Sequence, residues 1–447
     1  MPFTQPRVAF VTGCSGISGN AIVEYLIRQP KSEWSRIVVT SRSPPRNYWQ
    51  DPRVEFVALD FLEPVETTIQ KMFSYCRDVT HAFFTSYVHT DDFTRLAELN
   101  VPLFENFLTA IDTVAGGNLQ RVCLQTGGKN YGVHLGPFPA PARETLTRYE
   151  DHGLNFYYTQ EDFMFELHKQ RSWSYNIIRP GGIIGFAPAK NGMSESITLA
   201  LYMLISKELG EVPRFPGNKL FYNSCDDKST AESIADMSVW AVTREHTKNE
   251  AFNHANGDTF VWRYLWRNMG KYWGLDIPDQ TTFPEINDDG KMANEFRMSE
   301  WAADKKLVWD RICEKYGGSK DAFGSGTWGY FDWAVGKTWP TTMSITKARK
   351  FGWNRYDDTE ENYYETFRTF ANAGVLPSRR AVLGTIGDGG SAPVKAEANE
   401  LEHGDSVITN GANESQKVDT LERIDSKWTK EDHMSVTSHD SAIEVVS

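Results

Sequence analysis

The sequence RVAFVTGCSGISG, from Arg7 to Gly19, decides the fold. Residues 8–11 are apolar and, with Arg7, form a short run rich in Val and Phe, as in a buried strand. Residues 20–28, after the glycines, carry apolar side chains at helical spacing. A strand, a glycine-rich turn and a helix form a pyrophosphate site, because the turn admits the ligand and the helix N-terminus offers free N–H groups. An ordinary strand–helix turn is the simpler alternative. We predict a dinucleotide site that includes Gly13, Ser15, Gly16, Ile17 and Gly19.

Further apolar runs predict that this unit continues as a sheet. They alternate with segments of helical periodicity at 63–73, 92–115 and 155–170. The expected strands are residues 36–40, 54–59, 80–85, 120–126, 175–178 and, further along the chain, 251–254. Near-continuous apolar strands that alternate with helices are typical of an α/β fold with a doubly wound parallel sheet. We expect a Rossmann domain in residues 1–190, with contributions from about residues 225–258.

The second half of the chain predicts helices and then a polar tail. Helical periodicity continues over residues 194–207, 230–243, 262–273, 300–316, 328–336 and 360–373. We expect a smaller, mostly helical substrate-binding portion in residues 191–379. Residues 381–447 contain 13 acidic and 5 basic residues, a net charge of −8 out of −12 for the whole chain. Such a segment cannot bury enough apolar surface to fold, so we expect residues 380–447 to be a disordered acidic tail.

Composition argues against several classes of partner. The net charge of −12 disfavours nucleic acid and anionic membranes. No apolar run reaches the roughly 18 residues of a membrane span, and the first strand begins too early to leave room for a signal peptide. The five cysteines are scattered without metal-binding spacing, as in reduced thiols of the cytosol. We expect a cytoplasmic protein without a metal site, and a homodimer stays open.

The residues after the second and third strands bear on the type of cofactor. Ser41 and Arg42 follow the second strand. An acid there favours NAD, whereas an arginine accommodates the 2′-phosphate of NADP, so we predict NADPH. A solvated loop arginine is the alternative. Asp60 could receive the adenine amino group or cap the next helix. The predicted site also includes residues that end or follow neighbouring strands, namely Phe61, Thr85, Gln125 and Ile183.

The fifth strand leads into the segment that carries the predicted chemistry. Lys129 follows this strand, at the edge where such sheets bind ligands. The segment NFYYTQED then opens a helix at Asn155. A short-chain dehydrogenase would have Tyr-x-x-x-Lys in this helix. Here Glu161 stands four residues after Tyr157, so the lysine at the right place is Lys129.

Together with LQTGGKNYGVHLGPF, IIRPGGIIGFAP and RFPGNKLFYNSCDDKSTAESIADMSVWAV, these motifs give a specific resemblance over about residues 6–376. The chain resembles the progesterone 5β-reductase/iridoid synthase family, an atypical branch of the extended short-chain dehydrogenases. The resemblance implies NADPH-dependent reduction of the C=C bond of a small apolar enone. It implies Lys129 and Tyr157 as the catalytic pair, with Tyr158 as the alternative tyrosine.

The chain departs from this family at two motifs. Asn130 stands where the family usually has His, and Ser41 where it usually has the first of two arginines. A shortened Pro-rich loop around residues 137–150 bears on substrate identity. The resemblance also implies a pocket-covering helix in the aromatic segment Trp328–Trp333. The predicted substrate-binding residues are Tyr131, Phe138 and Phe331.

Two other classes of function stay open at this point. One is a different enzyme on the same site, either a carbonyl reductase or a cyclase that holds NADP without turning it over. The other is a non-enzymatic NADP-sensing Rossmann protein. The presence of both Lys129 and Tyr157 disfavours a sensor, which would need neither. A phenol is a suitable neutral donor to an enolate oxygen, and a nearby ammonium would add positive charge.

Overall fold

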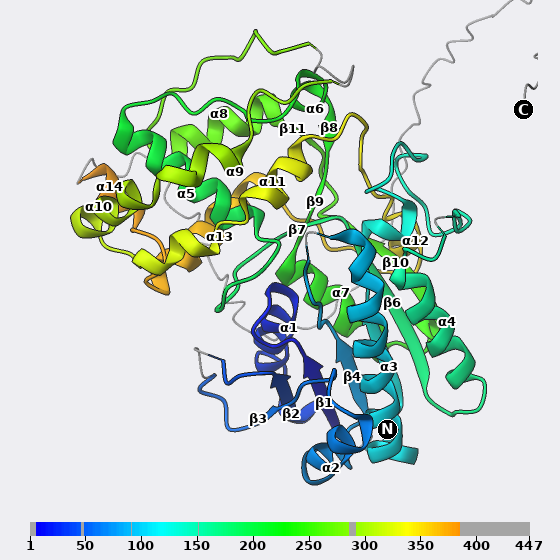
Figure 1. The fold of residues 1–447 in the computed structure, drawn as a ribbon. Coiled ribbons are helices and arrows are strands. Elements are labelled where there is room, and N and C mark those ends of the chain that lie inside the picture. The colour runs from blue at the N-terminus through cyan, green and yellow to red at the C-terminus, as the bar shows by residue number, and fades with distance from the viewer. Residues whose placement is uncertain (1–5, 46–48, 91, 151, 286–291, 385–447) are drawn as a thin grey trace, which may run out of the picture. The chain divides into compact units, whose positions relative to one another are not determined.

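The computed structural model describes residues 6–45, 49–90, 92–150, 152–285 and 292–384. A seven-stranded parallel sheet forms its lower half, with the strand order β10-β6-β5-β4-β1-β2-β3 (Figure 1). The predicted doubly wound sheet is therefore confirmed. The strands are β1 (Arg7–Thr12), β2 (Trp34–Ser41), β3 (Val54–Ala58), β4 (His81–Phe84), β5 (Arg121–Gln125), β6 (Ser174–Pro180) and β10 (Glu250–His254).

The side chains of β1 alternate between two cores, because successive residues of a strand point to opposite faces. Ala9 and Val11 lie in a core that includes residues of α1 (Ile17–Ile27) and α7 (Ala231–Thr243). Val8 and Phe10 lie in the core shared with α2 (Val65–Cys76), α3 (Leu96–Ala115) and α4 (Phe156–His168). Burial on both faces explains why the strands are nearly continuous apolar runs.

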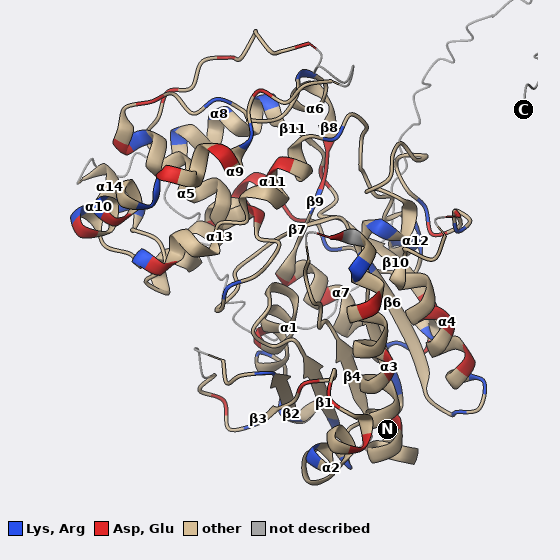
Figure 2. Cartoon of the chain, viewed as in Figure 1, with Lys and Arg blue, Asp and Glu red and all other residues tan. Residues whose placement is uncertain are grey.

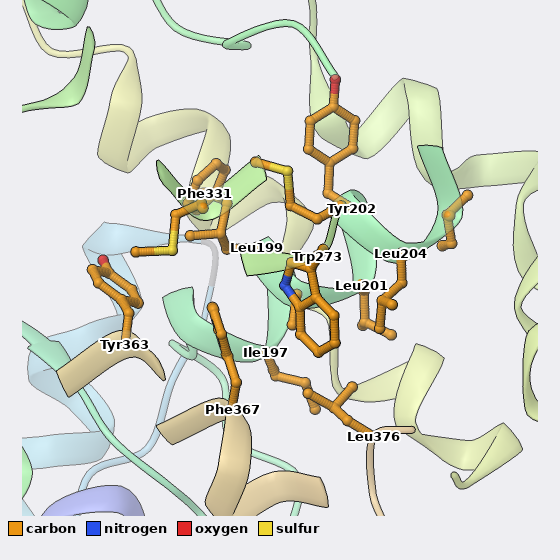
Figure 3. Close-up of a cluster of buried hydrophobic side chains, with 14 of the residues drawn as sticks. Ile197, Leu199, Leu201, Tyr202, Leu204, Trp273, Phe331, Tyr363, Phe367 and Leu376 are labelled. Atoms are coloured by element: carbon orange, nitrogen blue, oxygen red, sulfur yellow. The ribbon is translucent and has the colours of Figure 1, made fainter. Parts of the chain in front are cut away.

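A second group of helices follows the sheet and has its own core. Residues Glu195–Ser206 of α5 (Glu195–Leu209) are all buried. Trp273, Phe331, Tyr363 and Phe367 belong to the same apolar cluster (Figure 3), and the helical character of this part is confirmed. The other helices of this core are α6 (Lys219–Asn223), α8 (Trp262–Tyr272), α9 (Met298–Trp301), α10 (Lys306–Tyr316), α11 (Trp328–Val335), α13 (Thr359–Asn372) and α14 (Arg379–Leu383).

Two short sheets complete this part of the chain. β7 (Gly182–Ile184) pairs in parallel with β9 (Lys228–Thr230). β8 (Cys225–Asp226) pairs antiparallel with β11 (Phe260–Val261). The segment that follows α11 continues into the short helix α12 (Thr346–Lys350).

Two expectations from the sequence need correction. The helix expected over 300–316 is broken, because α9 passes into the 3-10 turn Ala302–Asp304 before α10 begins. The helix α14 (Arg379–Leu383) extends past residue 380, the predicted start of the tail, and its Val382 packs into the helical core. The rest of the predicted tail, residues 385–447, lies outside the described residues.

Acidic and basic residues are interspersed along the outer helices (Figure 2). The helix α10, for example, contains Lys306, Asp310, Arg311, Glu314 and Lys315. Among the helices of the described ranges, none is both long and apolar enough to cross a membrane.

A buried ion pair joins α4 to β6. The carboxylate of Glu161, 2% exposed, accepts hydrogen bonds from Arg179 at 2.8 Å and from Arg148 at 2.9 Å. The next residue, Asp162, also contacts Arg148, but its side chain is 59% exposed. We therefore expect the loss of the Glu161 carboxylate to destabilise the fold more than the loss of the Asp162 carboxylate.

We predict that Glu161→Ala lowers the free energy of unfolding by about 3–5 kcal/mol, because it leaves the Arg179 charge buried without its partner. The matched change Asp162→Ala should lower it by no more than about 0.5 kcal/mol, since exposed pairs contribute little. Denaturant titration of both variants measures the difference. Equal losses in the two variants would contradict the structural role of the buried pair.

Candidate active site

A cavity of about 590 Å³ lies at the carboxyl ends of the sheet strands. Its walls include Gly13 after β1, Thr85 after β4, Gln125 at the end of β5 and Pro180 at the end of β6. Residues of α5 and α11 contribute from the helical part. The cavity therefore lies where ligands bind to doubly wound sheets.

Nearly all of the predicted cofactor residues line this cavity. Gly19 is the exception, because it lies beneath the turn: a Cβ there would lie 2.2 Å from the carbonyl oxygen of Gly13. The residues in the wall are Gly13, Ser15, Gly16, Ile17, Ser41, Arg42, Asp60, Phe61, Thr85, Gln125, Lys129, Tyr157 and Ile183.

The glycine turn has the geometry of a phosphate cradle. Gly13 adopts φ +64°, and a Cβ at this position would lie 3.0 Å from the carbonyl oxygen of Thr85. At Gly16, a Cβ would lie 3.2 Å from the Gly13 oxygen. Helix α1 begins directly after Gly16, without a side-chain cap or an acidic residue in its first turn. The turn and the positive end of the helix therefore fit a pyrophosphate.

The strand ends beside this cradle carry polar groups. Ser15 donates a hydrogen bond to the Ser41 hydroxyl at 3.2 Å, and Arg42 is exposed in the cavity wall. Asp60 accepts a hydrogen bond from the Leu62 N–H at 3.0 Å. Because α2 begins at Val65 after Pro64, Asp60 is not the N-cap of that helix.

Lys129 and Tyr157 both line the cavity. Lys129 lies in the short 3-10 turn after β5, and its Nζ donates to the Tyr87 hydroxyl at 3.3 Å. The Tyr157 ring passes over Gly127, where a Cβ would lie 3.5 Å from the phenol oxygen. Among the described residues, no group forms a hydrogen bond with the Tyr157 hydroxyl, so its donor is available to a ligand.

Asn155 ties these two residues together. Its Oδ1 accepts from the Tyr157 N–H at 3.3 Å, as the N-cap of α4. Its Nδ2 donates to the Lys129 carbonyl oxygen at 3.0 Å, which also accepts from the Tyr149 hydroxyl at 2.9 Å. One buried amide thus connects the start of α4 to the turn that carries Lys129.

The neighbouring residue Tyr158 points elsewhere. Its hydroxyl donates to the Asn130 carbonyl oxygen at 2.6 Å, and its ring lies 4.6 Å from the Arg148 guanidinium. Tyr158 is absent from the cavity wall. Glu161, at the place of the usual lysine, is held by the ion pair with Arg179.

Burial shifts the pKa values of the polar groups in this wall. It lowers the pKa of Lys129 to about 8, because the ammonium is removed from water. It raises the pKa of the Tyr157 and Tyr87 phenols above their ordinary value. Tyr157 is therefore a neutral hydrogen-bond donor at neutral pH, in the same cavity wall as a lysine that is charged below about pH 8.

The three predicted substrate-binding residues do not line the cavity. The Tyr131 hydroxyl donates to Asn253 in the interior at 2.5 Å, and Phe138 packs against the core next to the sheet. Phe331 is fully buried in the helical core. Of the aromatic residues expected in the pocket-covering helix, Trp328, Tyr330, Phe331 and Trp333, the structure places Tyr330 and Trp333 of α11 in the cavity wall. Residues adjacent in a helix point about 100° apart.

Several residues of the wall, and Asn155 behind it, were not predicted from the sequence. Tyr87 follows β4 and could have been found as a strand-end residue. Asn155 has an N-cap signal, an asparagine before an apolar helix. The charged residues Asp226, Lys228 and Lys337 had no such signal, because tertiary packing alone brings them to the cavity. In the part of the chain that the structure describes, no group of His, Cys, Asp and Glu is arranged to hold a metal.

Comparison with solved structures supports the fold. The chain superposes on UDP-glucose 4-epimerase from Thermotoga maritima with a TM-score of 0.55 and 16% identity, covering 82% of this chain and 99% of the epimerase. A putative epimerase from Burkholderia cenocepacia gives a TM-score of 0.54 at 14% identity, covering 83% of this chain and 100% of that one. These likenesses concern the fold alone.

Sequence comparison identifies closer relatives. A short chain dehydrogenase, gsfE, from Penicillium aethiopicum is 41% identical over 83% of this chain and all of its own length. An (S)-8-oxocitronellyl enol synthase from Nepeta racemosa is 33% identical (78% of this chain, 88% of the relative). A 3-oxo-Delta(4,5)-steroid 5-beta-reductase from Arabidopsis thaliana is 30% identical (83% and 93%). The model of the PRISE-like Rossmann-fold domain matches residues 9–377, and the chain therefore belongs to the PRISE-like Rossmann-fold family.

Proposed function

We propose that this protein is an NADPH-dependent reductase of the C=C bond of α,β-unsaturated carbonyl compounds. The observation that carries the proposal is the available Tyr157 hydroxyl in the same cavity wall as Lys129 and the glycine turn. The relatives named dehydrogenase, enol synthase and 5-beta-reductase support an oxidoreductase. The two latter names support chemistry at an enone or its enol.

The chain's own residues would hold the cofactor at the sheet edge. Gly13, Gly16 and the N-terminus of α1 fit its pyrophosphate, and Arg42 is available to a 2′-phosphate. A bound NADPH would supply the hydride for the reduction.

Tyr157 and Lys129 would stabilise the charge that forms on the substrate. When the β-carbon of an enone gains a hydride, negative charge develops on the carbonyl oxygen. The Tyr157 phenol, kept protonated by its raised pKa, would donate a hydrogen bond to that oxygen. The Lys129 ammonium would add positive charge close by. A proton must then reach the α-carbon to give the saturated carbonyl compound.

Product identification tests the reaction class. Purified protein, NADPH and a panel of small enones should give saturated carbonyl products, with deuterium at the β-carbon when the cofactor is deuterated at the transferred position. An allylic alcohol would instead establish a carbonyl reductase, which the same donor pair could support. Absence of turnover with bound cofactor would favour a cyclase or an NADP-sensing protein.

We predict that Tyr157→Phe lowers kcat by roughly 10²–10³, as for the loss of one donor to an oxyanion. Cofactor affinity should be retained, since only the hydroxyl is removed. The matched change Tyr158→Phe should alter kcat only a few-fold, because that hydroxyl is used on the Asn130 backbone. Steady-state kinetics with one enone compares them, and the reverse ranking would contradict the assignment.

We predict that kcat/KM falls as the pH rises through about 8, where Lys129 loses its proton. The sign follows from the lowered pKa: the ammonium is present below that value and absent above it. Lys129→Arg should shift this decline to higher pH. Lys129→Ala should lower kcat/KM at all pH values and abolish the decline near pH 8. A decline that persists unchanged in both variants would show that another group titrates.

We predict that NADPH binds more tightly than NADH and that Arg42→Ala removes this preference. The expected loss for NADPH is about tenfold or more, as for one charge-assisted hydrogen bond. Arg28→Ala is the matched control, because Arg28 ends α1 outside the cavity wall and pairs with Glu24. Calorimetric titration with NADPH and with NADH measures the affinities of the unaltered protein and of both variants. Equal affinities of the unaltered protein for the two cofactors would refute the prediction.

A further inference from the structure

The cavity wall contains a tyrosine, Tyr87, to which the proposed reaction assigns no role. β4 ends at Phe84, and Tyr87 follows three residues later. In the sheet, β4 lies between β1 and β5 (Figure 1). Its carboxyl end therefore borders both the glycine turn after β1 and the turn with Lys129 after β5.

The Tyr87 hydroxyl contacts the ammonium of Lys129. It accepts a hydrogen bond from Lys129 Nζ, with 3.3 Å between the nitrogen and the phenol oxygen. In the part of the chain that the structure describes, this is the only hydrogen bond of the hydroxyl. Nζ also lies 5.7 Å from the centre of the same ring. The polar end of Tyr87 is thus committed to Lys129.

Packing holds the ring of Tyr87 in place. Its centre lies 5.9 Å from that of Phe156, which begins α4 and is 2% exposed, and 6.3 Å from that of His89. The Phe156 ring in turn lies 4.4 Å from the ring of Tyr157. A tyrosine has only two side-chain torsions, so a packed ring presents its hydroxyl at a fixed place.

The ammonium of Lys129 needs such a fixed partner, because it ends a flexible four-carbon stem. The hydrogen bonds from Asn155 and Tyr149 end on the backbone carbonyl oxygen of Lys129. They fix the turn rather than the ammonium. The Tyr87 hydroxyl acts on the ammonium itself, and a hydrogen bond that involves a charged group is stronger than one between neutral groups.

The titratable side chains around this contact stay neutral near pH 8. Burial raises the pKa of Tyr87, Tyr157 and Tyr330 above the ordinary value of a phenol. Burial, and then the charge of Lys129, lower the pKa of His134 to about 4. An acceptor that bonds to an ammonium favours the charged form. Removal of the Tyr87 hydroxyl should therefore lower the pKa of Lys129.

We infer that Tyr87 is a positioning residue for Lys129: its hydroxyl accepts a hydrogen bond from the ammonium and holds it, charged, at the cavity wall. The inference rests on the proposed reductase function, in which this ammonium stabilises the charge that develops on the substrate. Tyr87 acts through Lys129 and needs no contact with the substrate. Tyr87→Phe tests the inference, because it removes only the hydroxyl and keeps the ring on Phe156.

NMR titration of the full chain, isotope-labelled at the lysine Cε, measures the pKa of Lys129 without any substrate. The Lys129→Arg variant identifies its signal. We expect a pKa of about 8 in the unaltered protein. In Tyr87→Phe it should be about one pH unit lower, as for the loss of one hydrogen bond to a charged group. Tyr87→Trp keeps an aromatic ring but offers only an N–H donor, so it should act likewise and serves if the Phe variant does not fold.

The matched control is Tyr158→Phe. The Tyr158 hydroxyl bonds to the carbonyl oxygen of Asn130, in the same turn as Lys129, rather than to the ammonium. A general disturbance of this turn would lower the pKa of Lys129 in both variants. Loss of the contact with the ammonium should lower it in Tyr87→Phe alone.

Kinetics with one enone and NADPH gives a second readout. The decline of kcat/KM should begin about one pH unit lower in Tyr87→Phe, so that its kcat/KM is about tenfold below that of the unaltered protein at pH 9. Tyr158→Phe should keep the midpoint of the unaltered protein. A loss in Tyr87→Phe that is equal at every pH would show a merely structural role and overturn the inference.

The outcomes separate this inference from the proposed function. An unchanged pKa of Lys129 in Tyr87→Phe overturns the inference, and so does an equal fall in Tyr158→Phe. If the unaltered protein reduces no enone, the proposed reaction fails, whereas the NMR titration still decides whether Tyr87 holds the Lys129 ammonium.

Discussion

The hydrogen bonds of Asn155 are the constraint on which the candidate site depends. Lys129 and Tyr157 are 28 residues apart and belong to different elements, a turn after β5 and the first turn of α4. No helical spacing relates them, so their mutual position must come from a tertiary contact. The Asn155 side chain supplies it by capping α4 with its oxygen and holding the Lys129 carbonyl with its nitrogen.

This arrangement also explains why the helix tolerates an acid where short-chain dehydrogenases have a lysine. If Lys129 supplies the cation as proposed, the position four residues after Tyr157 does not need to carry one. Glu161 there binds Arg179 at the end of β6, which fixes α4 against the sheet. The position that carries a lysine in short-chain dehydrogenases thus contributes here to the contact between α4 and β6, while the lysine of the cavity wall follows β5.

Much of this architecture could be predicted from the sequence, for physical reasons that particular elements illustrate. Strands buried on both faces produce apolar runs such as RIVVT, and β2 lies there. The glycine turn was predictable because only glycine accepts the positive φ of Gly13 next to the Thr85 backbone. The motifs predicted Lys129 and Tyr157 as residues of the site, and both line the cavity. For α11 the sequence indicated a group of aromatic residues but not which of them line the wall. A helix buried on several sides has no clear polar face, so Phe331 and Tyr330 could not be told apart.

The charged group around Lys228 could not be predicted from the sequence. It makes one part of the cavity wall charged. Asp226 and Lys228 flank a short loop, while Glu195 and Lys337 come from segments more than 140 residues apart. Burying these charges is costly unless each finds a partner. The carboxylates meet Lys228, the Tyr363 hydroxyl and the Trp262 indole. Within this group of four residues, the Lys337 ammonium has one side-chain hydrogen bond among the described residues, to the Thr341 hydroxyl. A purely apolar pocket would orient a ligand by shape alone, whereas this wall also offers charged side chains to a polar ligand.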